Sequence, residues 1–306
     1  MGRVYEALNK AERAPVTGGG EADKELGLLD GRDAHGHKRG PDAEAQDFKF
    51  VPYSLDAPSL AEIQRINGER DLALESRMLM TRPSRTVELD QQRIDRRLTP
   101  CYESPARISD EFNRAAIALI SAASEFPIKR VLVTAPDHGS GKTLTAINLA
   151  FALARARKRV LLIDCDLGRP SILRMLALDA DIGLSEMSNT DVRPGDGAIR
   201  IAPDGITVIP MRAPVANSAE LLGNSRFRSI LEEFEPDYDF MLFDSSPLLD
   251  SADAKLLARL TDRVILVIAA GTVTSSQLGR AIGGLNKERV LGVVLNRFPQ
   301  HSETIN

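Results

Sequence analysis

Apolar and polar positions follow two different patterns in the two parts of the chain. From residue 106 to residue 306, short continuous apolar runs alternate with stretches in which apolar residues recur at helical spacing. Continuous apolar runs are typical of strands that are buried on both faces of a parallel sheet. The pattern therefore predicts an α/β domain with a doubly wound, mainly parallel sheet.

The expected elements follow from these runs and from the capping residues between them. The apolar runs predict strands at residues 131–135, 159–166, 206–211, 240–244, 263–270 and 290–297. Helical spacing predicts helices at residues 109–125, 144–156, 171–177, 183–188, 217–234, 251–261 and 275–285.

The first 105 residues lack the strand pattern. Apolar spacing predicts a short amphipathic helix at residues 2–13, and a capping-box pattern that begins at Ser59 predicts a second helical stretch. The remainder is polar, charged or proline-rich and predicts disordered linkers at residues 14–50 and 81–106. We therefore divide the chain into an N-terminal region of short helices and disordered linker, residues 1–105, and an α/β domain, residues 106–306.

A phosphate-binding loop is predicted between the first apolar strand and the helix that starts near Leu144. Residues 135–143 read A-P-D-H-G-S-G-K-T, a relaxed form of G-x-x-x-x-G-K-[ST] with Pro136 at the first glycine. Glycines let backbone N–H groups turn toward phosphate oxygens at a helix N-terminus. The predicted ligand-binding residues are Gly139, Ser140, Gly141, Lys142 and Thr143. A glycine-rich turn with a surface lysine is the alternative.

Three carboxylates at predicted strand ends complete the candidate site. Asp164 and Asp166 end one apolar run, and Asp244 ends another. Mg²⁺ in nucleotide sites uses one or two carboxylates beside the phosphates. We expect Asp244 to hold a metal-bound water, and Asp164 or Asp166 to accept a proton from an attacking hydroxyl or to add to the metal shell. Helix capping is the alternative for each acid alone. The combination predicts that residues 106–306 are a P-loop NTPase-like nucleotide-binding domain, with ATP and Mg²⁺ as ligands.

Composition excludes several other classes. The formal net charge of -4 disfavours a general nucleic-acid binder, and no apolar run approaches the length of a membrane span. The first residues lack a signal-peptide core, which predicts a cytoplasmic protein.

Cys165 lies in an apolar run and is expected to be a buried thiol. His138 lies in the loop, where it either touches a phosphate or is a simple loop residue.

Several motifs in the same order are similar to those of the bacterial tyrosine kinases of capsule and exopolysaccharide synthesis. The resemblance spans roughly residues 104–298 and rests on the phosphate loop and four further segments: L-L-I-D-C-D-L-G-R-P (161–170), N-S-A-E-L-L (217–222), F-D-S-S-P-L-L-D-S-A-D-A (243–254) and L-G-V-V-L-N-R (291–297).

This resemblance implies an ATP-dependent protein-tyrosine kinase that uses Mg²⁺ and works with a membrane chain-length-determining protein, a polysaccharide co-polymerase. Such a protein is cytoplasmic, or peripheral at the inner membrane through its partner, and can form homo-oligomers. The resemblance gives Lys142 the phosphate role, Thr143 and Asp244 the magnesium roles, Asp164 the activation of the tyrosine hydroxyl and Asp166 a supporting role. It places Asn296 at a position that contacts adenine in related ATPases.

The chain departs from the family pattern at three places. The final residues, F-P-Q-H-S-E-T-I-N, contain no tyrosine cluster. The family's E-x-x-R-x-x-R helix reads Glu111, Arg114 and Ile117, so its last arginine is missing. The family pattern has an arginine two residues after the second acid, which is Asp166 here. This chain has Gly168 at that position, and Arg169 follows one residue later.

Two other functions remain as alternatives. One is a partitioning or positioning ATPase, whose loop carries an extra lysine at the position that Asp137 occupies here. The other is a non-catalytic, nucleotide-gated scaffold of a polysaccharide export complex.

Overall fold

The structure is a computed structural model that describes residues 49–52, 81–98, 106–190, 192–203 and 205–297. The helices expected at residues 2–13 and from Ser59 lie outside these ranges. No helix within the described ranges is long and apolar enough to cross a membrane.

The described residues form one nine-stranded sheet in the order β1-β9-β8-β3-β7-β4-β6-β5-β2. The six strands from β9 to β6 are mutually parallel, whereas β1 pairs antiparallel with β9 and β5 pairs antiparallel with β6. This confirms the mainly parallel sheet. The strands span β1 Lys49–Pro52, β2 Arg85–Glu88, β3 Arg130–Thr134, β4 Val160–Cys165, β5 Ile199–Ala202, β6 Ile206–Ile209, β7 Phe240–Ser245, β8 Arg263–Ala269 and β9 Val290–Asn296.

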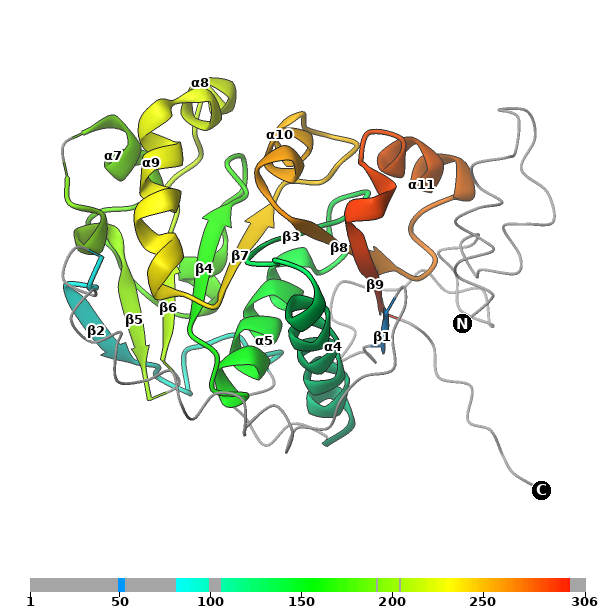
Figure 1. Ribbon diagram of the computed structural model, residues 1–306, viewed down its shortest axis with the longest axis horizontal. Helices are drawn as coiled ribbons and strands as arrows, with labels where there is room; N and C mark the ends of the chain where they lie inside the picture. The colour runs from blue at the N-terminus through cyan, green and yellow to red at the C-terminus, as the bar shows by residue number, and fades with distance from the viewer. Residues whose placement is uncertain (1–48, 53–80, 99–105, 191, 204, 298–306) are drawn as a thin grey trace.

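Helices cover both faces of the sheet, as Figure 1 shows. The helices form two groups, one on each face of the sheet. In β3, the side chains of Val131 and Val133 pack on the face of the first group, whereas that of Leu132 packs on the face of the second group. This alternation buries both faces of each central strand, which explains the continuous apolar runs. The first group is α4 Ala106–Glu125, α5 Lys142–Arg155 and α6 Ile172–Met175. The second group is α7 Leu184–Asn189, α8 Ser218–Gly223, α9 Ser225–Phe234, α10 Asp253–Leu260 and α11 Ser275–Ile282.

The structure corrects parts of the two linkers expected in the N-terminal region, whereas residues 14–48 and 99–105 of these linkers lie outside the described ranges. Within the expected linker at 81–106, β2 extends the sheet beside β5, and the side chains of Ile94 and Leu98 are buried in the core. At the end of the other expected linker, β1 pairs with β9. Edge strands need no continuous apolar run, because only part of their surface is covered, and β2 is largely exposed. The division of the chain after residue 105 remains a prediction.

One helix differs from its expected form. The helix expected at residues 217–234 is two helices, because Asn224 ends α8 and caps α9 by accepting a hydrogen bond from the N–H of Arg226. The predicted cap at Asn217 is confirmed, since its side chain accepts from the N–H of Glu220.

The topology brings three strand ends together. β3 lies between β8 and β7, and β7 lies beside β4. Asp164 of β4 and Asp244 of β7 are register partners, and Asp244 is also paired with Val133 of β3. The carboxyl ends of parallel strands meet at one edge of a sheet, where ligands of this fold class bind.

Candidate nucleotide-binding site

The predicted phosphate loop connects β3 to α5. Gly139 and Gly141 have φ values of 76° and 92°, a left-handed conformation that strains any residue with a side chain. Gly141 is the N-cap of α5, and a Cβ atom there would collide with the side-chain amide of Asn296. The loop therefore requires glycine at position 141 for both backbone conformation and space.

Asn296, at the end of β9, holds the loop from the side. Its Nδ2 donates to the carbonyl oxygen of Ser140 at 2.9 Å, and its Oδ1 accepts from the N–H of Arg297 at 2.8 Å. The side chain is 6% exposed. Asn296 thus positions the backbone that would meet the phosphates, and its contact with adenine remains a prediction.

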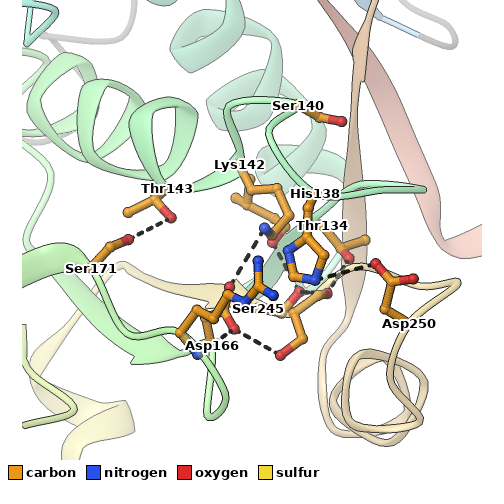
Figure 2. Close-up of polar contacts among 12 residues, drawn as sticks. Thr134, His138, Ser140, Lys142, Thr143, Asp166, Ser171, Ser245 and Asp250 are labelled. Carbon is orange, nitrogen blue, oxygen red and sulfur yellow. Dashed lines mark hydrogen bonds and ion pairs between the residues drawn. The ribbon is translucent and has the colours of Figure 1, made fainter. Parts of the chain in front are cut away.

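Lys142 is the first residue of α5 and points toward the ends of β4 and β7, as Figure 2 shows. Its Nζ lies 3.5 Å from Oδ2 of Asp166, and both residues are buried. The Ser246 hydroxyl donates to Oδ1 of Asp166 at 2.9 Å. Asp166 therefore orients the lysine that the sequence assigns to the phosphates.

Asp244 is a buried carboxylate without a hydrogen bond. Neither of its oxygens has a hydrogen-bond partner among the described residues, and the residue is fully buried. Burial raises the pKa of Asp244 to about 7, and the charge of Lys142 opposes the rise. The Thr143 hydroxyl also favours the ionised form, although it does not meet hydrogen-bond geometry. The two oxygens of Asp244, with the Thr143 hydroxyl near them, are therefore suited to bind a hard cation.

Asp164 has a different environment. Its oxygens accept hydrogen bonds from the backbone N–H groups of Asp166, Ser171 and Ile172 at 3.1 to 3.2 Å. These bonds fix the turn after β4 and the start of α6. Burial, followed by the charge of Asp244, raises the pKa of Asp164 well above its usual range, and the backbone N–H groups oppose this.

Two serines in the site were not identified from the sequence. Ser171 donates its hydroxyl hydrogen to Oγ1 of Thr143 at 3.1 Å, and Ser246 holds Asp166. Ser246 directly follows Asp244 and Ser245, so the run of acid and hydroxyl residues at the strand end was the available signal. Ser171 follows β4 by several residues and has no comparable signal.

His138 projects from the loop toward Asp250, with 3.3 Å between its Nε2 and Oδ2 of Asp250. Both side chains are well exposed. The sequence left open whether His138 touches a phosphate, and the structure places its imidazole against a carboxylate.

The thiol of Cys165 is buried at the end of β4, as expected. Burial, with the neighbouring charges of Asp164 and Asp244, raises the pKa of this thiol well above its usual range. The thiolate is therefore suppressed in the folded protein.

These residues fit a magnesium nucleotide. Left-handed glycines and the N-terminus of α5 offer backbone N–H groups to phosphate oxygens, and Lys142 adds a positive charge. The orphaned carboxylate of Asp244, with the Thr143 hydroxyl near it, offers the hard oxygen ligands that Mg²⁺ prefers.

Comparisons with known proteins agree with this geometry. CapB of Staphylococcus aureus is 29% identical over 207 residues, which cover 66% of this chain and 91% of that protein. The tyrosine-protein kinase YwqD of Bacillus subtilis (strain 168) is 29% identical over 216 residues, which cover 69% of this chain and 91% of that protein. The crystal structure of the VpsO kinase domain superposes with a TM-score of 0.57 at 28% identity, and the match covers 62% of this chain and 96% of that domain.

A family description accounts for the same part of the chain. Residues 131–306, more than half of the sequence, match the family described as the CobQ/CobB/MinD/ParA nucleotide binding domain. The match begins in β3, directly before the phosphate loop, and includes all three carboxylates of the site. The chain therefore belongs to the CobQ/CobB/MinD/ParA nucleotide-binding domain family.

Proposed function

We propose that this protein is a Mg-ATP-dependent tyrosine-protein kinase of a polysaccharide synthesis or export system. The orphaned, fully buried carboxylate of Asp244 beside the phosphate loop is the observation that carries the proposal. The likeness to YwqD and to the VpsO kinase domain supports the kinase activity. The family resemblance described above supports a membrane chain-length-determining partner, through which the protein would act at the membrane.

Each polar group of the site has a role in this proposal. The loop backbone and Lys142 bind and orient the phosphates, and Asp166 keeps Lys142 in place. Thr143 and Asp244 would hold Mg²⁺, and the ion, when bound, would supply positive charge beside the phosphates. Asp164 accepts the proton of the tyrosine hydroxyl, as the resemblance implies, and its bonds to the backbone N–H groups fix its position.

The tyrosines in the sequence restrict where the phosphate can go. The chain contains Tyr5, Tyr53, Tyr102 and Tyr238. Tyr238 is 7% exposed, its ring lies 6.1 Å from that of Phe234, and burial raises its pKa to about 12. A buried phenol cannot reach a phosphoryl donor without unfolding of its surroundings. We therefore propose that the acceptor is Tyr5, Tyr53, Tyr102 or a tyrosine of the partner.

A nucleotide-gated scaffold is the second candidate. Asp164 favours it, because both of its oxygens already accept backbone hydrogen bonds and burial disfavours its charged form. The partitioning-type ATPase has less support. The position of its extra lysine holds Asp137, whose carboxylate and carbonyl accept from the Ser140 hydroxyl and thereby brace the loop.

The deciding experiment is phosphotyrosine mapping by mass spectrometry. The full chain is incubated with Mg-ATP, with and without its proposed membrane chain-length-determining partner. Lys142→Ala tests the site, and Lys255→Ala, on α10, is the matched control. We expect phosphotyrosine that depends on Lys142 and not on Lys255. ATP binding without phosphotyrosine under both conditions would refute the kinase and favour the scaffold, and hydrolysis alone would favour the ATPase.

A further inference from the structure

A second cavity lies at the other end of the sheet from the phosphate loop. Its volume is about 790 Å³, and its walls come from the segment before and within β2, the end of α5, the residues that lead into β4 and β7, and the turn between β5 and β6. Ala154, near the end of α5, lines this cavity, whereas Lys142 begins the same helix in the phosphate loop. The 14 residues of α5 rise about 20 Å. The two sites are therefore separate.

The cavity is strongly basic. Its lining includes five cationic side chains, namely those of Arg82, Arg157, Lys158, Arg159 and Arg200. The only carboxylate among the lining residues is that of Asp237, which accepts a hydrogen bond from the Thr81 hydroxyl. The positive charge of this cavity, which we call the basic pocket, is thus far larger than its negative charge.

Three of these five cations form no ion pair with any residue that the structure describes, namely Arg82, Arg157 and Arg200. Arg159 forms an ion pair with Asp239 at 3.0 Å. Arg82, Arg157 and Arg200 are exposed, so their guanidinium groups can reorient toward a ligand. Guanidinium groups bind phosphate in bidentate geometry, and several of them around one cavity favour a polyanion over a single carboxylate.

The lining also includes apolar and aromatic residues. Pro83, Ala154, Pro203 and Tyr238 contribute to the walls, together with the hydroxyl residues Thr81 and Thr86. Arg159 and Arg200 lie close enough to the Tyr238 hydroxyl to influence its ionisation, which places charged and apolar walls side by side. A cavity of this volume accommodates a small organic ligand.

We propose that the basic pocket binds a small phosphorylated anion, with phosphate groups on the guanidinium groups of Arg82, Arg157 and Arg200 and any apolar part against Pro83 and Tyr238. Residues 81–86 form one wall of the pocket, so such a ligand ties the N-terminal part of the chain to the nucleotide-binding domain. The same cations could instead serve only to complement the C-terminal dipole of α5, and that reading predicts no ligand.

The test is a titration of isotope-labelled full chain with inorganic tripolyphosphate, followed by NMR. We expect shifts at the amides of Lys158 and Gly205, at the basic pocket, in addition to shifts at Gly139 and Gly141 in the phosphate loop. In Lys142→Ala, the response of Lys158 and Gly205 should persist while that of the loop weakens. No response at Lys158 and Gly205 in the wild-type protein would overturn the proposal, whatever happens in the loop.

Variants and vesicles then identify the determinants and the source of the phosphate. The double variant Arg82→Ala/Arg200→Ala should weaken tripolyphosphate binding at the pocket by roughly a hundredfold, about tenfold for each guanidinium group. Arg228→Ala, an exposed arginine of α9 outside the pocket, should leave it unchanged. Equal affinity in the double variant would overturn the proposal.

Co-sedimentation with phosphatidylglycerol vesicles, reversed by tripolyphosphate and lost in the double variant, would assign the phosphate to a lipid headgroup. Binding of tripolyphosphate without vesicle binding would assign it to a free anion. Both results support a phosphate site.

Discussion

Replacement of Asp244 by asparagine should stabilise the protein while it removes the proposed magnesium site. Asp244 is fully buried, its oxygens have no hydrogen-bond partner among the described residues, and burial raises its pKa from 3.8 to about 7. Asparagine has almost the same shape and carries no charge. Its amide can also donate to neighbouring carboxylates, of which Asp164 on the adjacent strand is the register partner.

The size and the pH dependence of the effect follow from the shifted pKa. Between about pH 4 and pH 7 the folded protein retains a proton on Asp244 that the unfolded chain has lost, so the free energy of unfolding falls as pH rises through this window. The full shift corresponds to about 4 kcal/mol above pH 7. Because the pKa of Asp164 also depends on the charge of Asp244, we expect a gain of about 2–4 kcal/mol for Asp244→Asn at pH 8 and a much smaller gain at pH 5.

Urea unfolding of both proteins at pH 5 and pH 8, without nucleotide or metal, measures this difference. Asp253→Asn is the control, because Asp253 is also buried but accepts a hydrogen bond from the Ser218 hydroxyl at 2.8 Å. The control should lose stability at both pH values. Mg-ADP should stabilise the wild-type protein more than Asp244→Asn. An Asp244→Asn variant that is no more stable than wild type at pH 8, or equally stabilised at both pH values, would refute this reasoning.

Three further changes test other parts of the structure. Gly141→Ala should lower nucleotide affinity and cost about 1–3 kcal/mol in unfolding free energy, because the new Cβ atom meets the side chain of Asn296 and the backbone has a positive φ. Calorimetric titration with ADP and urea unfolding measure these two effects, and an unchanged affinity would contradict the loop geometry. Leu98→Ala should cost about 2–5 kcal/mol in urea unfolding, and a loss below about 0.5 kcal/mol would mean that residues 81–98 are not part of the core. Asn224→Ala should cost about 1 kcal/mol by loss of the α9 cap, whereas Asn224→Asp should retain most of the stability in the same measurement.

The sequence predicted the centre of the sheet and not its edges. The strands β3, β4, β7 and β8 are apolar on both faces, so each appears as a continuous run such as R-V-L-V-T. The strands β1, β2 and β5 pair at or near the edges and have shorter or more polar sequences, which resemble linkers when local pattern alone is considered. Their pairing depends on neighbours that are distant in sequence, for example Arg85 with Ile199.

The candidate site was predicted more completely than the edges of the sheet, because its residues lie in a motif with fixed spacing. Lys142 and Asp244 lie together at the carboxyl ends of β3 and β7, as expected. The hydrogen bonds that occupy the oxygens of Asp164 were not predictable, since they come from the path of the chain at Ser171. The role of Asn296 in holding the phosphate loop was also not predictable, because it depends on the position of β9 relative to that loop.

The buried thiol of Cys165 can report the local opening of the sheet at β4. The residue lies between Asp164 and Asp166, and its register partner is Ser245, next to Asp244. Because the folded environment suppresses the thiolate, an alkylating reagent can modify Cys165 only after this part of the sheet opens. In a Cys101→Ser background, the rate of alkylation at Cys165 would therefore report the free energy of local opening of β4 beside the candidate site. The slowing of that reaction by a ligand would measure how tightly the ligand locks the two acidic strands together.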